Sequence, residues 1–442
     1  MRVNKGKKSY LSAALKAVLP VMIGLSAVFP AGVSAAPKAL DVIGIARVFG
    51  DGEKVSEAAV LYSEPIDPAT VDAADYEVAG KKIEAVSVNS IPAMSARKAP
   101  GKYVVLKFKQ ENTVSMNPLG KKPPRRGGGD PGSGKTISHS DRMAPDLSIA
   151  VQQVGTVENT KGEAAPVMTE PLSSSRTLEP DLSRFTQQVY NDPKTGIQLP
   201  YNLFLPKNYD SSKKYPLVYF GVDMSGNNND LTTPLYQGNG AIVWTDPEFQ
   251  RMHPCIVVAP QYTDSLVNKL GMMTTDDNVW TPGLELVKDF LYDMLDTYSV
   301  DKDRVYGTGQ SQGGMANIAI SDRYPDLFAA QYLVACQWNT NEMMALKDKK
   351  LWITVCEGDT KAFPGMNAAT SMWEKAGTKV ARNTEFWDST ASPAVLDKKV
   401  DALIREGAPI NYTVFKGGNH MYTWSFAYQI PEIREWIFAQ HK

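Results

Sequence analysis

The 442-residue sequence predicts a small all-β sandwich followed by a mostly parallel sheet with helices on both faces. Three observations lead to this prediction. Short apolar runs separated by turn residues fill residues 42–108, which is typical of an all-β domain. From Phe185 onward, apolar runs of strand length alternate with longer helical patterns. Within that second part, Ser311 stands in a glycine-rich turn between an expected strand and an expected helix.

The first 35 residues have the composition of a secretory signal peptide. They contain a cationic start, a 13-residue mostly apolar run over 17–29 and the small residues Val33-Ser34-Ala35. The alternative is a membrane anchor, but the run is shorter than the roughly 20 residues that span a bilayer. We therefore expect cleavage near Ala35 and a secreted or extracytoplasmic protein with no stable membrane span after cleavage.

Residues 36–160 are predicted to form the β domain. Its strands are expected in runs such as VIGIARVFG, AAVLYSEPI and KYVVLKF. A stretch rich in Pro, Gly and charge predicts a disordered loop near 115–142, and residues 147–157 are interpreted as a further strand after it. Residues 161–184 have the composition of a linker.

The segment Gly129–Thr136 matches the phosphate-binding pattern G-x-x-x-x-G-K-[ST]. A functional loop of this kind needs a strand before it and a helix after it, because backbone N–H groups and the helix N-terminus must converge on the phosphates. Here Lys-Lys-Pro-Pro-Arg-Arg precedes the segment and Ile-Ser-His-Ser follows it. We therefore predict no nucleotide at this segment.

Residues 185–442 are predicted to form a catalytic α/β domain. Its apolar runs, such as YPLVYFGV and KLWITVCEGD, are nearly continuous, which is typical of strands buried on both faces. A clear amphipathic helix is expected within 279–300, a further helix ending near Gly407, and a last helix from Pro431.

The stretch Gly307–Gly314 contains the pattern G-x-S-x-G around Ser311, with a strand expected before it and a helix after it. This pattern is typical of a sharp turn that exposes a nucleophilic serine. Glycine is required at Gly309 and Gly313 because a Cβ there would collide with the neighbouring helix or strand. The backbone N–H of Gln312, at the helix N-terminus, is expected to point to the same place.

A nucleophilic serine needs a base, normally a histidine held by a carboxylate. Of the four histidines, His420 is the best candidate, because it follows the last expected strand in a glycine-rich loop. Asp359 lies just past the strand LWITVC and is the preferred carboxylate; Glu357 and Asp388 are the alternatives. The chain order Ser311, Asp359, His420 is that of the α/β-hydrolases.

These residues and the segments YPLVYFGVDMSGNNND, DRVYGTGQSQGG and GGNH resemble a secreted α/β-hydrolase-fold serine esterase. The resemblance covers residues 195–442 and is to the polyhydroxybutyrate depolymerase-like and feruloyl or acetylxylan esterase-like enzymes. The β-rich front resembles the immunoglobulin-like N-terminal domain of some such esterases. The resemblance implies an exported serine carboxylesterase with the triad Ser311, His420 and Asp359.

The sequence departs from these enzymes where they carry His-Gly after the strand that begins PLV. Val222 and Asp223 stand there instead, followed by Met224. An oxyanion hole built from the backbone N–H groups of Gln312 and Met224 is still expected, although a carboxylate facing it would oppose the developing charge. Trp338 and Trp424 are candidates for lining the substrate pocket.

Several alternatives stay open. A serine peptidase of the prolyl-oligopeptidase type shares the fold and triad order, and a catalytically inactive binding protein is the rival from another class. The charges nearly balance, with 47 Lys and Arg against 48 Asp and Glu, so no nucleic-acid partner is expected. Neither a metal nor an organic cofactor is implied, and the substrate is a small-molecule or polymer-linked ester. A homo-oligomer and a Cys336–Cys356 bridge are left open.

Overall fold

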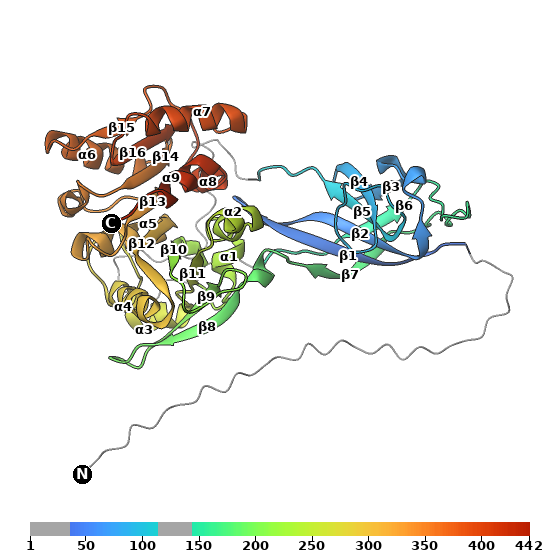
Figure 1. The fold of residues 1–442 in the computed structure, drawn as a ribbon, viewed down its shortest axis with the longest axis horizontal. Coiled ribbons are helices and arrows are strands. Elements are labelled where there is room, and N and C mark those ends of the chain that lie inside the picture. Colours follow the sequence, from blue (N-terminus) through green and yellow to red (C-terminus); the bar gives the residue numbers. More distant parts are fainter. Residues whose placement is uncertain (1–35, 114–143) are drawn as a thin grey trace, which may run out of the picture.

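The computed structural model describes residues 36–113 and 144–442. The predicted signal peptide (1–35), the predicted disordered loop near 115–142 and the segment Gly129–Thr136 lie outside the described residues. The described chain forms two sheets, which occupy opposite ends of an elongated molecule (Figure 1).

The first sheet has the strand order β3-β6-β7-β1-β2-β5-β4. Its pairs are antiparallel except for β1 with β7, which run parallel. Apolar side chains from both halves of this sheet enclose a core around Tyr62, whose hydroxyl donates to Oε1 of Gln153 at 2.7 Å. The strands are β1 (Ala39–Phe49), β2 (Gly52–Ile66), β3 (Tyr76–Val78), β4 (Ile83–Asn89), β5 (Gly101–Phe108), β6 (Ala150–Gln153) and β7 (Leu172–Leu178).

Residues 161–184 were expected to be a linker, and this interpretation is wrong for part of the segment. Strand β7 lies inside it and pairs with β1, from Val42 with Ser174 to Ile45 with Leu178. Its sequence LSSSRTL has few apolar residues, and none of its residues is fully buried. A strand of that composition carries little hydrophobic signal.

The second sheet has the strand order β15-β16-β14-β13-β12-β10-β11-β9-β8. Its strands run parallel from β15 to β11, and β9 and β8 add an antiparallel edge. The central strands are fully buried, as their continuous apolar sequences require. The strands are β8 (Thr186–Asn191), β9 (Gln198–Phe204), β10 (Tyr215–Gly221), β11 (Ile256–Pro260), β12 (Val300–Gln310), β13 (Ala330–Val334), β14 (Leu351–Cys356), β15 (Val380–Arg382) and β16 (Ile410–Phe415).

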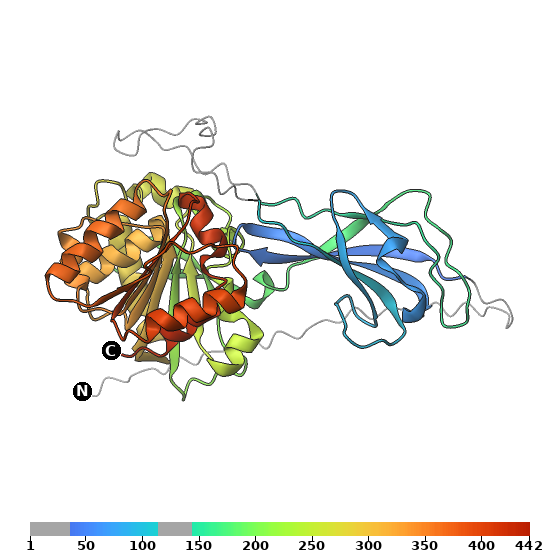
Figure 2. The same cartoon turned by 90° about the horizontal axis from the view of Figure 1, so that it is seen from above.

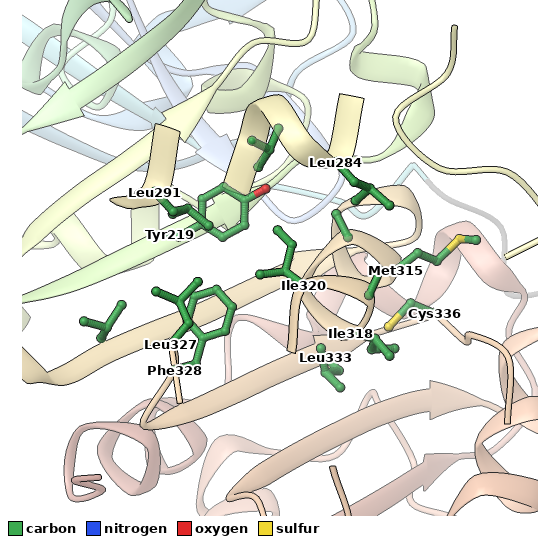
Figure 3. Packing of buried hydrophobic residues seen from close by; sticks show 14 of the residues in the cluster. Tyr219, Leu284, Leu291, Met315, Ile318, Ile320, Leu327, Phe328, Leu333 and Cys336 are labelled. Atoms are coloured by element: carbon green, nitrogen blue, oxygen red, sulfur yellow. The ribbon is translucent and has the colours of Figure 1, made fainter. Parts of the chain in front are cut away.

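Helices cover both faces of this sheet (Figure 2). On one face α4, α5 and α6 bury an apolar cluster that includes Leu284, Ile318 and Trp373; part of it is shown in Figure 3. On the other face α2, α7, α8 and α9 bury a second cluster. The helices are α1 (Thr233–Tyr236), α2 (Pro247–Met252), α3 (Asp264–Leu270), α4 (Pro282–Thr297), α5 (Gln312–Arg323), α6 (Ala362–Lys375), α7 (Pro393–Ile404), α8 (His420–Ala427) and α9 (Pro431–Phe438). Within the described ranges, none of the helices has the length and apolar character needed to cross a bilayer.

Between β14 and β16 the chain is more elaborate than the single helix that was expected near Gly407. It forms α6, then the three-residue edge strand β15, then α7. A strand this short falls below the length at which apolar periodicity is recognisable.

The β1–β2 hairpin of the first sheet reaches the second domain, as Figures 1 and 2 both show. Its tip contacts α8 so closely that a Cβ at Gly50 would lie 2.0 Å from the carbonyl oxygen of Ser425. Nδ2 of Asn112 donates to Oγ of the same serine at 2.9 Å. The two domains are therefore in direct contact at α8.

Candidate active site

Ser311 lies at the turn between β12 and α5, where its backbone has φ 50° and ψ −121°. Few residues other than glycine adopt a positive φ, so this turn holds the serine in a strained conformation. The glycines around it are forced by close approach. A Cβ on Gly313 would lie 1.9 Å from the carbonyl oxygen of Gly221, and a Cβ on Gly309 would lie 2.6 Å from the carbonyl carbon of Gly313.

Ser311, His420 and Asp359 meet at the carboxyl ends of three strands. Ser311 follows β12, Asp359 follows β14 and His420 follows β16. Oγ of Ser311 and Nε2 of His420 are 2.8 Å apart, and Nδ1 of His420 and Oδ2 of Asp359 are 2.6 Å apart. The structure thus brings together the three residues that were expected to act as a unit.

His420 is the first residue of the short helix α8, not part of a loop as the sequence suggested. The side chain of Asn419 caps this helix by accepting from the backbone N–H of Tyr422. Gly417 and Gly418, with φ of 61° and 68°, turn the chain from β16 into the helix. The asparagine before the aromatic-rich run HMYTWSFA was the available signal for this helix.

The carboxylate of Asp359 is only 2 % exposed and accepts several hydrogen bonds. Its Oδ1 accepts from the backbone N–H groups of Lys361 at 3.1 Å and Ala362 at 2.9 Å. Burial acts to raise the pKa of Asp359, but the hydrogen bond and charge interaction with His420 and the two backbone bonds outweigh it, so this pKa lies below its usual value.

An ionised Asp359 can only accept hydrogen bonds, so Nδ1 of His420 must carry the proton that it donates. Nε2 of His420 is then free to accept from the hydroxyl of Ser311. This is the tautomer in which an imidazole can take up the proton of an attacking serine.

The other candidate residues lie elsewhere. Oε2 of Glu357 accepts from the backbone N–H of Gly417 at 3.0 Å, and Asp388 accepts from Thr390. Nε2 of His253, at the end of α2, lies 2.8 Å from Oε2 of Glu435 in α9. His139 lies outside the described residues.

Gln312 and Met224 both line the same cavity as Ser311. Gln312 is the first residue of α5, and Met224 is the first residue of a short 3₁₀ helix, η4 (Met224–Gly226). First-turn N–H groups have no acceptor within their own helix and are available to an incoming oxygen.

Asp223 does not leave a free carboxylate beside these N–H groups. Its Oδ1 accepts from the backbone N–H of Ser225 at 2.7 Å and from the Ser225 hydroxyl. Its Oδ2 accepts from Nε2 of Gln310 at 3.0 Å. The side chain is 4 % exposed and serves as the N-cap of η4.

A cavity of about 550 Å³ opens at Ser311 and His420. Its wall combines polar side chains with a few apolar ones, and two of the lining residues, Lys361 and Asp276, form an ion pair. Trp424 lines the cavity with its ring 5.1 Å from that of His420. The expectation for Trp338 is not met, because its ring is buried in the core and its Nε1 donates to Glu342 at 2.8 Å. The apolar part of the wall consists of Met224, Met315, Met421 and Trp424.

The three cysteines are free thiols. Cys336 follows β13 and Cys356 ends the neighbouring strand β14, which was the condition for a bridge, but they pack into the clusters on opposite faces of the sheet. Strand pairing places the backbones side by side and leaves the two sulfurs on different sides.

Comparison with known proteins agrees with both halves of this architecture. Residues 41–166 match the model of the esterase Ig-like N-terminal domain, and residues 287–439 match the model of the prolyl oligopeptidase family. The chain is an α/β-hydrolase-fold serine hydrolase with an immunoglobulin-like N-terminal domain.

The fold of the whole serine hydrolase is shared with the crystal structure of a thermostable esterase. The two superpose with a TM-score of 0.67 at 24 % identity, covering 91 % of this chain and 100 % of that one. A feruloyl esterase module from Clostridium thermocellum, an S954A mutant complexed with sinapinate, matches with a TM-score of 0.38 and 14 % identity, over 58 % of this chain and 87 % of its own. No curated protein was found to match the chain.

Proposed function

We propose that this serine hydrolase is an exported carboxylesterase that cleaves acyl esters through an acyl-enzyme on Ser311. The observation that carries the proposal is the hydrogen-bonded series Ser311, His420, Asp359, which lies at a cavity also lined by Gln312 and Met224, the first residues of α5 and η4. The N-terminal half matches a domain model described for esterases, and the two-domain neighbour is a thermostable esterase.

In the proposed reaction Oγ of Ser311 attacks the ester carbonyl carbon while its proton passes to Nε2 of His420. The carbonyl oxygen becomes an oxyanion that the N–H groups of Gln312 and Met224 stabilise. The imidazolium, held by Asp359, then gives its proton to the leaving alcohol and the C–O bond breaks. Water repeats the sequence on the acyl-enzyme, which releases the acid and restores the Ser311 hydroxyl.

The test of this proposal is active-site labelling combined with an ester series. A fluorophosphonate probe should label the wild-type protein and fail to label Ser311→Ala. Hydrolysis of p-nitrophenyl esters from acetyl to long acyl chains should depend on Ser311 in the same way and should reveal the acyl length that the cavity accepts. A folded wild type that takes no label would instead favour the inactive binding protein.

A serine peptidase is the second candidate, because residues 287–439 match the prolyl oligopeptidase family model. Peptide p-nitroanilides separate the two functions. Turnover of the anilides above that of the esters would assign the peptidase.

We also propose export, on the cationic and apolar pattern of residues 1–35. Mass spectrometry of the secreted chain should find Ala36 at its N-terminus.

A further inference from the structure

A side-chain contact joins the two loops that carry the proposed oxyanion hole. Gln310 directly precedes Ser311, and Asp223 directly precedes Met224. Nε2 of Gln310 donates to Oδ2 of Asp223 at 3.0 Å. One hydrogen bond therefore connects the end of β12 to the start of η4.

Both partners are buried, with Gln310 0 % and Asp223 4 % exposed. The other carboxylate oxygen caps η4 by accepting from the backbone N–H of Ser225 at 2.7 Å and from its hydroxyl. A buried carboxylate that loses a donor is left with an unsatisfied charge, which is costly. Gln310 thus satisfies the carboxylate oxygen of Asp223 that does not cap η4.

Gln310 is itself held from a third element. Its Nε2 also donates to Oε1 of Gln237, 3.2 Å away at the end of α1. The Gln310 amide is therefore held by Asp223 and by Gln237, which keeps the turn at Ser311 and the loop after β10 in a fixed relative position.

We infer that Asp223 and Gln310 are positioning residues that set the N–H of Met224 at a fixed place relative to Oγ of Ser311. This inference rests on the proposed function. Asp223 then has a role other than opposing the oxyanion, because its carboxylate accepts hydrogen bonds from Ser225 and Gln310. An oxyanion hole is effective only if its donors are held in place before the charge develops.

The variant that tests this is Gln310→Met, which keeps the side-chain length and removes the donor to Asp223. Its matched control is Gln331→Met in the adjacent strand β13, a buried glutamine (2 % exposed) whose Nε2 donates to Ser321 away from the cavity. Both variants lose one buried amide, so both should lose similar stability. Only Gln310→Met should lower kcat, by roughly 10- to 100-fold with KM changed less than about threefold.

A trifluoromethyl ketone provides a second readout, since its adduct with Ser311 carries an oxyanion. Its inhibition constant should rise by the same factor as kcat falls in Gln310→Met and stay near the wild-type value in Gln331→Met. Ser225→Ala, which removes one donor to Asp223, is the milder variant for use if Gln310→Met does not fold; it should change both values in the same direction by roughly 3- to 10-fold.

A folded variant with kcat and inhibition constant within about twofold of the wild type overturns the positioning role and leaves the proposed function intact. A wild type that neither hydrolyses esters nor takes a fluorophosphonate label overturns the proposed function, and the positioning role with it.

Discussion

Oγ of Ser311 lies 2.8 Å from Nε2 of His420, although 109 positions separate the two residues in the sequence. The contact exists because β12 and β16 are parallel strands of one sheet, so the segments that follow them emerge at the same edge. Four predictions follow from this site and from the packing around it.

Asp359→Asn should lower kcat for ester hydrolysis by roughly 10³- to 10⁴-fold. The asparagine amide would present a donor to Nδ1 of His420, which favours the tautomer whose Nε2 carries the proton and cannot accept from Ser311. Steady-state kinetics with a p-nitrophenyl ester measures the effect. Glu357→Gln, two residues earlier, is the control and should retain activity within about threefold; equal losses in the two variants would contradict the assignment.

Asp322→Asn should stabilise the protein at pH 8 and have little effect near pH 4. Burial, aided by Glu342, raises the pKa of Asp322 to about 8 from an ordinary value of 3.8. Between these two values the folded chain keeps a proton that the unfolded chain releases, so raising the pH across this window destabilises the folded state. Asparagine removes this penalty, and we expect a gain of about 1 kcal/mol or more at pH 8.

Thermal unfolding of both proteins from pH 4 to pH 8 measures this gain. Asp326→Asn is the matched control, since the Asp326 side chain is 96 % exposed. It should not show the gain in melting temperature that we expect for Asp322→Asn at pH 8. A difference from the wild type that stays constant with pH for Asp322→Asn would show that the Asp322 carboxyl titrates normally.

Gly50→Ala should lower ester hydrolysis although residue 50 lies in the other domain. The added Cβ would meet the carbonyl oxygen of Ser425 at 2.0 Å, so either the hairpin or α8 must shift, and α8 begins with His420. We expect kcat to fall by about 10-fold, in keeping with a small displacement of a catalytic group. Gly80→Ala is the control: its φ of 68° makes the alanine costly in stability, but nothing lies within 4 Å of the added Cβ, so it should keep normal kcat.

The three thiols should be unreactive in the folded protein. Burial raises the pKa of Cys255 and of Cys356 to about 12, so very little thiolate is present at neutral pH. A thiol reagent such as dithionitrobenzoate should titrate all three only after unfolding, and a reductant should not change the melting temperature. A reductant-dependent melting temperature would reveal a disulfide.

The position of Ser311 could be anticipated because its signal is local. Gly309 and Gly313 each stand two positions from the serine, so the spacing is visible in one short stretch, although the contact that requires Gly313 is with the distant Gly221 of β10. Asp359 and His420 were anticipated from their places after apolar strands, which in a parallel sheet all end at one edge.

Other features depended on contacts between distant segments. The part played by Asp223 depends on Gln310, 87 positions away, and no local pattern reveals that hydrogen bond. Trp338 and Trp424 both come shortly after strands of the same sheet, but the Trp338 ring is buried in the core while Trp424 lines the cavity. Strand β7 exists because β1 offers it an edge, although its own sequence LSSSRTL has little tendency to form a buried strand.

Helix α8 links the two halves of the chain mechanically. His420 is at its start and Ser425, which meets the hairpin tip, is five residues later, or about 8 Å along the helix axis. A displacement of the hairpin tip would therefore act on α8 within two helical turns of the imidazole. The N-terminal domain thus has a direct contact with the helix that carries the histidine.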